Sequence, residues 1–283
     1  MVNRVTAKLL LVLGASMFPC ITHAVPLVRT IGGSDPASIQ TTVDQFRADL
    51  GDLNPNVAGS FAGGRREINW DGVPDAFAAP NNLLPDFFNV NSPRGVVFTT
   101  PGTGFQVSAN GGVAAIEFGT INANYPTLFT PFSPQRLFTS LDSNIVDVLF
   151  FEPGSTTPGS TNGFGAVFTD VDLASTTGIE YFDASNNLLF SDFVEPGTVG
   201  NESLSFLGVS FTEGPVLSRV RITNGNSPLG AGVDEGADTD LVVMDDFIYG
   251  EPIAVRPVSE PWTLLLVGLG LLAMGIPKRP RTL

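Results

Sequence analysis

The sequence predicts an all-β protein, an antiparallel β-sandwich or jelly roll with one N-terminal amphipathic helix. Ten short apolar segments follow one another between residues 95 and 250, and turns rich in Gly, Pro and Asn separate them. The dipeptides Asn110-Gly111 and Asn224-Gly225 are typical of tight turns between antiparallel strands. Only one stretch has clear helical periodicity, and the 22 Phe residues can fill a large core.

The helix is expected over about residues 36–50. Ser34 or Asp35 can cap its N-terminus, and Gly51 can end it in a left-handed conformation. The apolar stripe at helical spacing consists of Ile39, Val43, Phe46 and Leu50. We expect this stripe to pack on a sheet.

The rest of the body divides into loops and strands. Residues 51–94 are rich in Pro, Asn, Asp and Gly, which predicts long loops with one short strand near residues 66–70. Strands are expected at residues 95–100, 104–109, 113–118, 145–151, 163–171, 178–184, 188–194, 203–211, 216–223 and 241–250. Because apolar segments continue on both sides of the long loop at 152–163, we expect one body domain over residues 25–255.

The composition excludes several kinds of chemistry. The only Cys and the only His are Cys20 and His23, so the body has neither. Disulfides, Cys or His zinc sites, Cys nucleophiles and Ser-His-Asp triads are therefore excluded there. Between Val25 and Val258 we count 9 Arg and 27 Asp or Glu, a net charge of 9 − 27 = −18. That charge repels nucleic acid and attracts cations such as Ca²⁺, although it also keeps an exported protein soluble.

The first 24 residues have the pattern of a secretory signal peptide. Arg4 and Lys8 precede an uncharged, mostly apolar run at residues 9–18, and small residues lie three and one positions before a cut between Ala24 and Val25. The run is too short to span a bilayer, so we expect export and removal by signal peptidase.

The C-terminal segment, residues 256–283, has the pattern of a membrane anchor. Residues 262–276 carry no charge and are expected to form a transmembrane helix. The basic cluster that follows contains Lys278, Arg279 and Arg281, and the positive-inside rule keeps such a cluster in the cytoplasm. The body would then face outward, in agreement with the signal peptide.

These C-terminal residues resemble the PEP-CTERM sorting signal of Gram-negative envelope proteins, in which a Pro-Glu-Pro motif precedes an apolar helix and a basic cluster. The motif stands here as Ser259-Glu260-Pro261, with Ser in place of the first Pro. The resemblance implies processing by an exosortase-type enzyme and association with surface or extracellular polysaccharide. Residues 164–194 and 244–252 also look like the β-sandwich bodies common among such proteins, and this second resemblance implies no activity.

Paired carboxylates in two predicted strands suggest a metal site. Asp170 and Asp172 lie two residues apart at a strand end, and Asp245 and Asp246 are adjacent in the last strand, where one of them must face the core. A buried carboxylate needs a hydrogen bond, an Arg or a hard cation. One hypothesis is a Ca²⁺ site built from some of Asp170, Asp172, Asp245 and Asp246, helped by Asp238 or Asp240. The alternative is that these are solvated or backbone-bonded turn carboxylates.

A second cluster has the composition of a sugar site. Glu67 and Asp71 flank Trp70, the only Trp of the body, whose ring could stack a pyranose between two carboxylates. The alternative is that Trp70 is a core aromatic and that Glu67 pairs with Arg65 or Arg66. The same two Arg residues could contact a uronate or form salt bridges within an acidic protein.

We expect an exported, non-enzymatic cell-surface or matrix protein with no catalytic residues. No phosphate-binding loop, dinucleotide fingerprint or nucleophile elbow is present in the sequence. One alternative is a Ca²⁺-dependent carbohydrate-binding module. A less favoured one is a carboxylate-dependent glycoside hydrolase.

Overall fold

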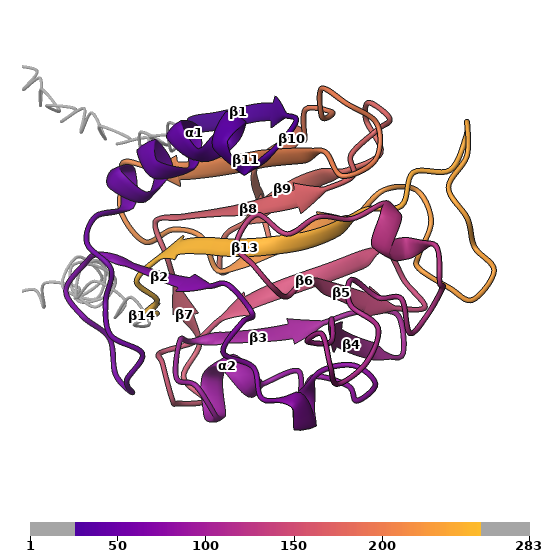
Figure 1. Ribbon diagram of the computed structural model, residues 1–283. Coiled ribbons are helices and arrows are strands. Elements are labelled where there is room, and N and C mark those ends of the chain that lie inside the picture. The colour runs from indigo at the N-terminus through magenta and orange to yellow at the C-terminus, as the bar shows by residue number, and fades with distance from the viewer. Residues whose placement is uncertain (1–25, 256–283) are drawn as a thin grey trace, which may run out of the picture.

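The computed structural model describes residues 26–255, and most of its regular structure is antiparallel β (Figure 1). The signal peptide expected with a cleavage site at Ala24 and Val25, and the expected sorting motif Ser259-Glu260-Pro261 with the apolar segment after it, lie outside these residues. Within residues 26–255, no helix has the length and apolarity needed to cross a membrane.

The strands form two large antiparallel sheets. The seven-stranded sheet contains, in spatial order, β1 (Pro26–Gly33), β11 (Leu204–Phe211), β8 (Gly163–Thr169), β13 (Val243–Gly250), β5 (Phe138–Leu141) and β4 (Gly104–Val107), with β2 (Arg65–Ile68) also paired to β13. The five-stranded sheet contains β10 (Leu188–Phe193), β9 (Gly178–Phe182), β12 (Arg219–Thr223), β6 (Ile145–Phe150) and β3 (Val96–Thr99). A small ribbon joins β14 (Ile253–Ala254) to β7 (Gly159–Ser160).

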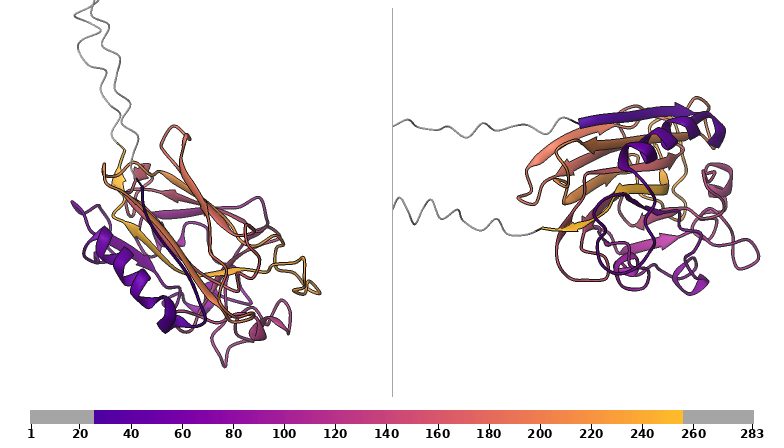
Figure 2. Two further views of the ribbon diagram at one scale, coloured as in Figure 1. Left: turned by 90° about the horizontal axis from the view of Figure 1, so that it is seen from above. Right: turned by 90° about the vertical axis from the view of Figure 1, so that its left-hand side faces the viewer.

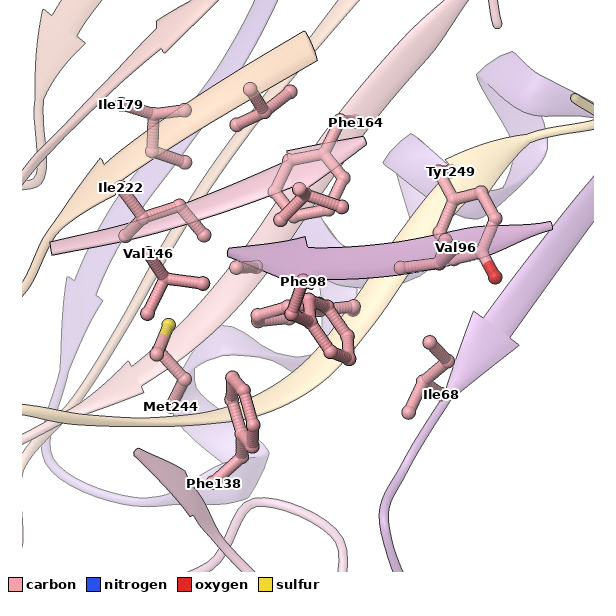
Figure 3. Close-up of a cluster of buried hydrophobic side chains, with 14 of the residues drawn as sticks. Ile68, Val96, Phe98, Phe138, Val146, Phe164, Ile179, Ile222, Met244 and Tyr249 are labelled. Atoms are coloured by element: carbon pink, nitrogen blue, oxygen red, sulfur yellow. The ribbon is translucent and has the colours of Figure 1, made fainter. Parts of the chain in front are cut away.

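The two sheets face each other across one apolar core, which is consistent with the predicted sandwich. Aromatic rings meet across the interface, with Phe98 of β3 lying 6.1 Å from Phe247 of β13 between ring centroids. Phe150 of β6 lies 6.3 Å from Phe164 of β8 and 5.7 Å from Tyr249 of β13. Figure 3 shows side chains of both sheets in this cluster. The Phe-rich composition therefore supplies the core that an acidic chain without disulfides needs.

Helix α1 (Pro36–Leu50) covers the outer face of the seven-stranded sheet (Figure 2, left). Asp35 and Ser38 form a capping box at its start, and the predicted stripe of Ile39, Val43, Phe46 and Leu50 is buried, as expected. Gly165 and Gly208 let the helix approach, because a Cβ at either position would lie 2.8 or 2.9 Å from the Phe46 ring. Short helical turns are η1 (Asp75–Phe77), α2 (Phe87–Val90) and η2 (Tyr125–Thr127).

Nine of the ten segments expected as strands contain strands, and the prediction of a mostly antiparallel β body is confirmed. The strand expected at residues 113–118 is wrong. That segment forms turns, with positive φ at Glu117 and Phe118, and the Phe118 side chain is buried in a separate small cluster with Tyr125 and Phe129. Strands β1, β5, β7 and β14 were not expected, and the strand expected near 66–70 is β2.

The two Asn-Gly dipeptides do not join hairpin partners, which corrects that interpretation. Asn110-Gly111 follows β4, whose sheet partner β5 begins only at Phe138. Asn224-Gly225 follows β12, which pairs with β6 and β9 rather than with the next strand, β13. Both dipeptides begin long excursions at the end of the molecule opposite the start of β1 and the end of β14 (Figure 1).

Candidate metal centre

Three carboxylates from two loops converge at that far end of the sandwich. Asp170 follows β8 directly, Asp172 lies two residues further, and Glu235 belongs to the loop between β12 and β13. One carboxylate oxygen from each residue lies within 4.8 Å of the others. Ca²⁺ binds oxygen ligands at about 2.3–2.6 Å, so oxygens up to about 5 Å apart can share one ion.

Asp170 is the most constrained member of the cluster. Its side chain is fully buried, and neither carboxyl oxygen has a hydrogen-bond partner among residues 26–255. Its φ is +71°, and its backbone N–H donates to the Ser203 carbonyl at 3.0 Å. Burying a carboxylate without a partner costs several kcal/mol, at least as much as losing a hydrogen bond to a charged group. A hard cation between Asp170 and its neighbours would remove that cost.

Asp240 holds the two loops together. One of its oxygens accepts the backbone N–H of Asp172 at 3.0 Å, and the other accepts the hydroxyl of Thr176. The backbone N–H of Asp240 itself donates to the side-chain oxygen of Asn226 at 3.0 Å. Asp240 is fully buried and both of its oxygens accept hydrogen bonds, so it positions Asp172 beside Asp170 and Glu235.

The electrostatics of the cluster are those of a site built for positive charge. Burial, together with the negative charges of Glu235, Asp172 and Asp240, raises the pKa of Asp170 to about 9. Burial also raises the pKa of Glu235 to about 6, against the lowering effect of the N–H of Leu241. The pKa of Asp172 is raised by burial and by Asp240. Each shift has the sign expected when like charges are held together without a counterion.

The donor set selects the class of metal. All the ligand atoms are carboxylate oxygens, which suit hard cations such as Ca²⁺ and Mg²⁺. Because Mg²⁺ demands oxygens at about 2.0–2.1 Å in strict octahedral geometry, a cluster supplied by two loops fits the more permissive Ca²⁺ better.

The other predicted pair, Asp245 and Asp246, lies elsewhere, which corrects the four-aspartate site. A bulge between Met244 and Phe247 buries both carboxylates. Asp245 accepts the N–H groups of Phe132 at 2.6 Å and Ser133 at 3.0 Å. Asp246 accepts the Ser133 hydroxyl at 2.6 Å and pairs with Arg47 at 3.0 Å. These partners satisfy the pair without a metal.

The loop before β13 contributes in a different way from the one expected. Asp238 is exposed, and only its backbone carbonyl takes part in the loop, accepting from the side chain of Asn226 at 2.9 Å. Asp240 joins as a positioning residue, and the candidate ligand from this loop is Glu235, which the sequence did not identify. The acidic run at residues 234–240 was the available signal, but it does not reveal which member faces Asp170.

The sugar-site hypothesis at Trp70 is not supported by the geometry. Trp70 is 1% exposed, stacks on Phe138 at 4.1 Å between ring centroids, and donates its indole N–H to the Asp245 carbonyl at 2.9 Å. Its ring faces are core surfaces, so the alternative of a core aromatic is the correct one.

The acidic neighbours of Trp70 also have structural partners. Glu67 accepts from Arg65 at 2.7 Å and from Arg47 at 3.1 Å. Asp71 accepts the backbone N–H groups of residues 135 and 136 at 2.7 and 3.1 Å. Arg66 is fully buried and pairs with Glu251 through two hydrogen bonds of 2.7 and 2.8 Å. The salt-bridge interpretation of the adjacent Arg pair is therefore confirmed.

No protein-family model matches this chain, and no curated protein matches it at a significant level. The function must therefore be argued from the residues and their arrangement.

Proposed function

We propose that this protein is an exported, non-enzymatic cell-surface or matrix protein whose β-sandwich body binds Ca²⁺ at one end. The observation that carries the metal proposal is Asp170, a fully buried carboxylate without a partner, held beside Asp172 and Glu235. Loop carboxylates that repel one another become favourable when an ion neutralises them, so the bound ion would fasten the two loops to the sheet.

Export and sorting rest on the two terminal segments of the sequence. Residues 1–24 have the signal-peptide pattern, and residues 256–283 resemble the PEP-CTERM signal, which implies an exosortase-type enzyme as partner. The orientation of the body supports this proposal, because β1 begins and β14 ends at the same end of the molecule (Figure 2, right). The acidic cluster lies at the other end, so an anchor after β14 would leave it facing away from the membrane.

The contacts of one carboxylate pair support the non-enzymatic part of this proposal. The pair proposed for sugar hydrolysis, Glu67 and Asp71, is engaged by Arg side chains and by backbone N–H groups. A general acid–base pair must be free to reach a substrate across a cleft. Glu67 and Asp71 are held by these partners, and Trp70 between them is buried, so it offers no exposed ring on which a sugar could stack.

A Ca²⁺-dependent carbohydrate-binding module is the second candidate. The observation in its favour is that Asp172 and Glu235 are only half-buried, so a bound ion would keep coordination positions on the solvent side. Sugar hydroxyls could occupy those positions. A glycan array probed in Ca²⁺ and in EDTA separates the candidates, because only the module retains glycans in a Ca²⁺-dependent way.

The metal proposal is tested by thermal unfolding of the full chain in mild detergent, in EDTA and in Ca²⁺. A ligand at about 100 times its dissociation constant stabilises by about 2.7 kcal/mol, which raises the midpoint of a chain of this size by about 5–10 °C. Asp170→Asn should abolish the rise. Asp238→Asn, an exposed change in the same acidic loop, should keep it. Equal midpoints in EDTA and Ca²⁺ for the unaltered chain would remove the proposal.

Sorting is tested by the intact mass of the protein recovered from membranes and from the medium of its own host. Loss of residues 1–24 and of the chain after about Glu260 would support both terminal assignments. A mass that runs through Leu283 and is found only in membranes would overturn exosortase processing.

A further inference from the structure

Arg94 is the one basic side chain of residues 26–255 that has no acidic partner. The sequence has no Lys in this range. Ion pairs engage the other Arg residues, namely Arg29, Arg47, Arg65, Arg66, Arg136, Arg219 and Arg221. An unpaired guanidinium is unexpected in a body whose acids outnumber its Arg residues threefold, and it calls for a physical reason.

The backbone of Arg94 is fixed on both sides. Its N–H donates to the Phe88 carbonyl at 2.8 Å, and its carbonyl accepts the Tyr249 hydroxyl at 3.0 Å. The guanidinium carbon lies 5.0 Å from the centre of the Phe88 ring, and Nε is buried without a hydrogen-bond partner in the described chain. The side chain is therefore held in place by packing, with its donors unused.

Arg94 lines a pocket of about 260 Å³. Its walls include Trp70, Phe87, Phe88, Asn91, Ser92 and Arg94. Asn91 and Ser92 use their backbone N–H groups to bond the Phe87 carbonyl, whereas within residues 26–255 their side chains form no hydrogen bond. The pocket thus brings together an amide, a hydroxyl and a guanidinium whose side chains form no hydrogen bond within residues 26–255, beside aromatic residues that are buried in the core.

The charge balance around the pocket favours a single negative charge. Burial lowers the pKa of Arg94, and the like charge of Arg66 lowers it further. Arg66 is already neutralised by Glu251, so one positive charge remains uncompensated here. The acidity of the rest of the body disfavours a dianion such as phosphate more than a monoanion. A carboxylate has one charge and the two-oxygen geometry that a guanidinium fork recognises.

We propose that the Arg94 pocket binds a carboxylate. The guanidinium would take the carboxylate, and Asn91 and Ser92 would bond polar substituents of the molecule that carries it. Two sources share this chemistry, a uronic acid unit of a polysaccharide and an aromatic acid. The site is independent of the metal centre, since the Arg94 carbonyl is bonded near the end of β13 and the acidic cluster lies beyond its beginning.

The test is calorimetric titration of the full chain in mild detergent with galacturonate and with benzoate. Galactose and benzyl alcohol, which lack the carboxylate, are the matched neutral ligands. For a single small ring, a dissociation constant of about 1 mM is expected. Arg94→Gln should weaken binding at least about tenfold, and Arg94→Lys should weaken it less, because the charge stays but the fork is lost. Arg29→Gln, a change to a surface ion pair elsewhere, should leave binding unchanged.

A second variant keeps the test valid if Arg94→Gln does not fold. Asn91 is exposed, so Asn91→Asp should fold, and its new carboxylate would compete with the ligand for Arg94 and abolish binding. Binding of galacturonate that requires Arg94 assigns the pocket to acidic sugars, and binding of benzoate alone assigns it to aromatic acids. Absence of binding by both carboxylates, equal binding of the neutral ligands, or insensitivity to both substitutions would overturn the proposal. None of these results depends on Ca²⁺.

Discussion

Asp170 and Glu235 come from different loops, yet each contributes a carboxylate oxygen to a group in which all oxygens lie within 4.8 Å. Asp170 is fully buried there and has no hydrogen-bond partner among the described residues. The loop that carries Glu235 is held against the end of β8 by Asp240, whose oxygens bond Asp172 and Thr176. The hydrogen bonds of Asp240 therefore help to hold Asp170, Asp172 and Glu235 close together.

Replacing the Asp170 carboxyl by an amide should stabilise the metal-free protein. In EDTA at pH 8, Asp170→Asn is expected to raise the free energy of unfolding by about 2 kcal/mol, because folding no longer requires Asp170 to take up a proton that it lacks in the unfolded state. Urea unfolding monitored by circular dichroism measures the difference. A variant less stable than the unaltered chain in EDTA would mean that the Asp170 carboxylate has a favourable partner, and the argument for a cation would fail.

Asp240 should behave in the opposite way. Asp240→Ala removes the acceptor for the N–H of Asp172 and for the Thr176 hydroxyl, and it is expected to lower stability by about 2–4 kcal/mol with or without Ca²⁺. The same urea titrations measure this loss. Asp238→Ala, an exposed neighbour, serves as the control and should change stability by less than about 0.5 kcal/mol. A loss seen only in the presence of Ca²⁺ would make Asp240 a ligand rather than a positioning residue.

Glu117 should make stability depend on pH. Burial, with the charge of Glu202 as a second cause, raises its pKa from 4.5 to about 7 in the folded protein. The folded state thus binds the proton more tightly than the unfolded state. Glu117 therefore lowers the free energy of unfolding at high pH. This loss of stability is absent below pH 4.5, grows as pH rises from 4.5 to about 7, and is complete above that range.

The expected size of the Glu117 effect is modest. The shift corresponds to about 3 kcal/mol at most, and partial exposure of the side chain reduces this to about 1 kcal/mol. Glu117 should therefore lower the free energy of unfolding by about 1 kcal/mol between pH 5 and pH 8. Glu117→Gln should lack this contribution to the change. Asp86→Asn, a change at an exposed acid elsewhere, should leave the change in unfolding free energy between pH 5 and pH 8 as it is in the unaltered chain. An identical pH profile for Glu117→Gln would show that the carboxyl is solvated.

The buried pair of Arg66 and Glu251 should be costly to break on one side. Glu251→Gln leaves the fully buried Arg66 guanidinium without a counterion and is expected to destabilise by about 3–5 kcal/mol. The double change Arg66→Met with Glu251→Leu should recover more than half of that loss, since burying two charges is itself unfavourable. A double variant less stable than Glu251→Gln would indicate that the hydrogen bonds of Arg66 to the loop carbonyls dominate.

Local patterns predicted the elements whose environment is local. The stripe on α1 is buried, as its spacing requires. Strand β13 has apolar residues at both parities because one face meets the core and the other meets α1. The segment at 113–118 has the composition of a strand but lies between Gly-rich turns and has no partner strand, so it turns instead.

The candidate metal centre could be predicted only in part, because some of its contacts join residues that are far apart in the sequence. The spacing of Asp170 and Asp172 brings them together at a strand end. The contribution of Glu235 depends on contacts that Asp240 makes with a distant loop, which no local pattern encodes. The bulge that carries Asp245 away from the cluster, and the positive φ that turns Trp70 into the core, are likewise set by long-range packing.

The most direct test of the metal centre is a calorimetric titration of Ca²⁺ into the full chain after treatment with EDTA, repeated with Asp170→Asn. We expect one ion bound per chain, weaker binding of Mg²⁺, and loss of Ca²⁺ binding in the variant. No heat of binding in the unaltered chain, or unchanged Ca²⁺ binding in Asp170→Asn, would contradict it.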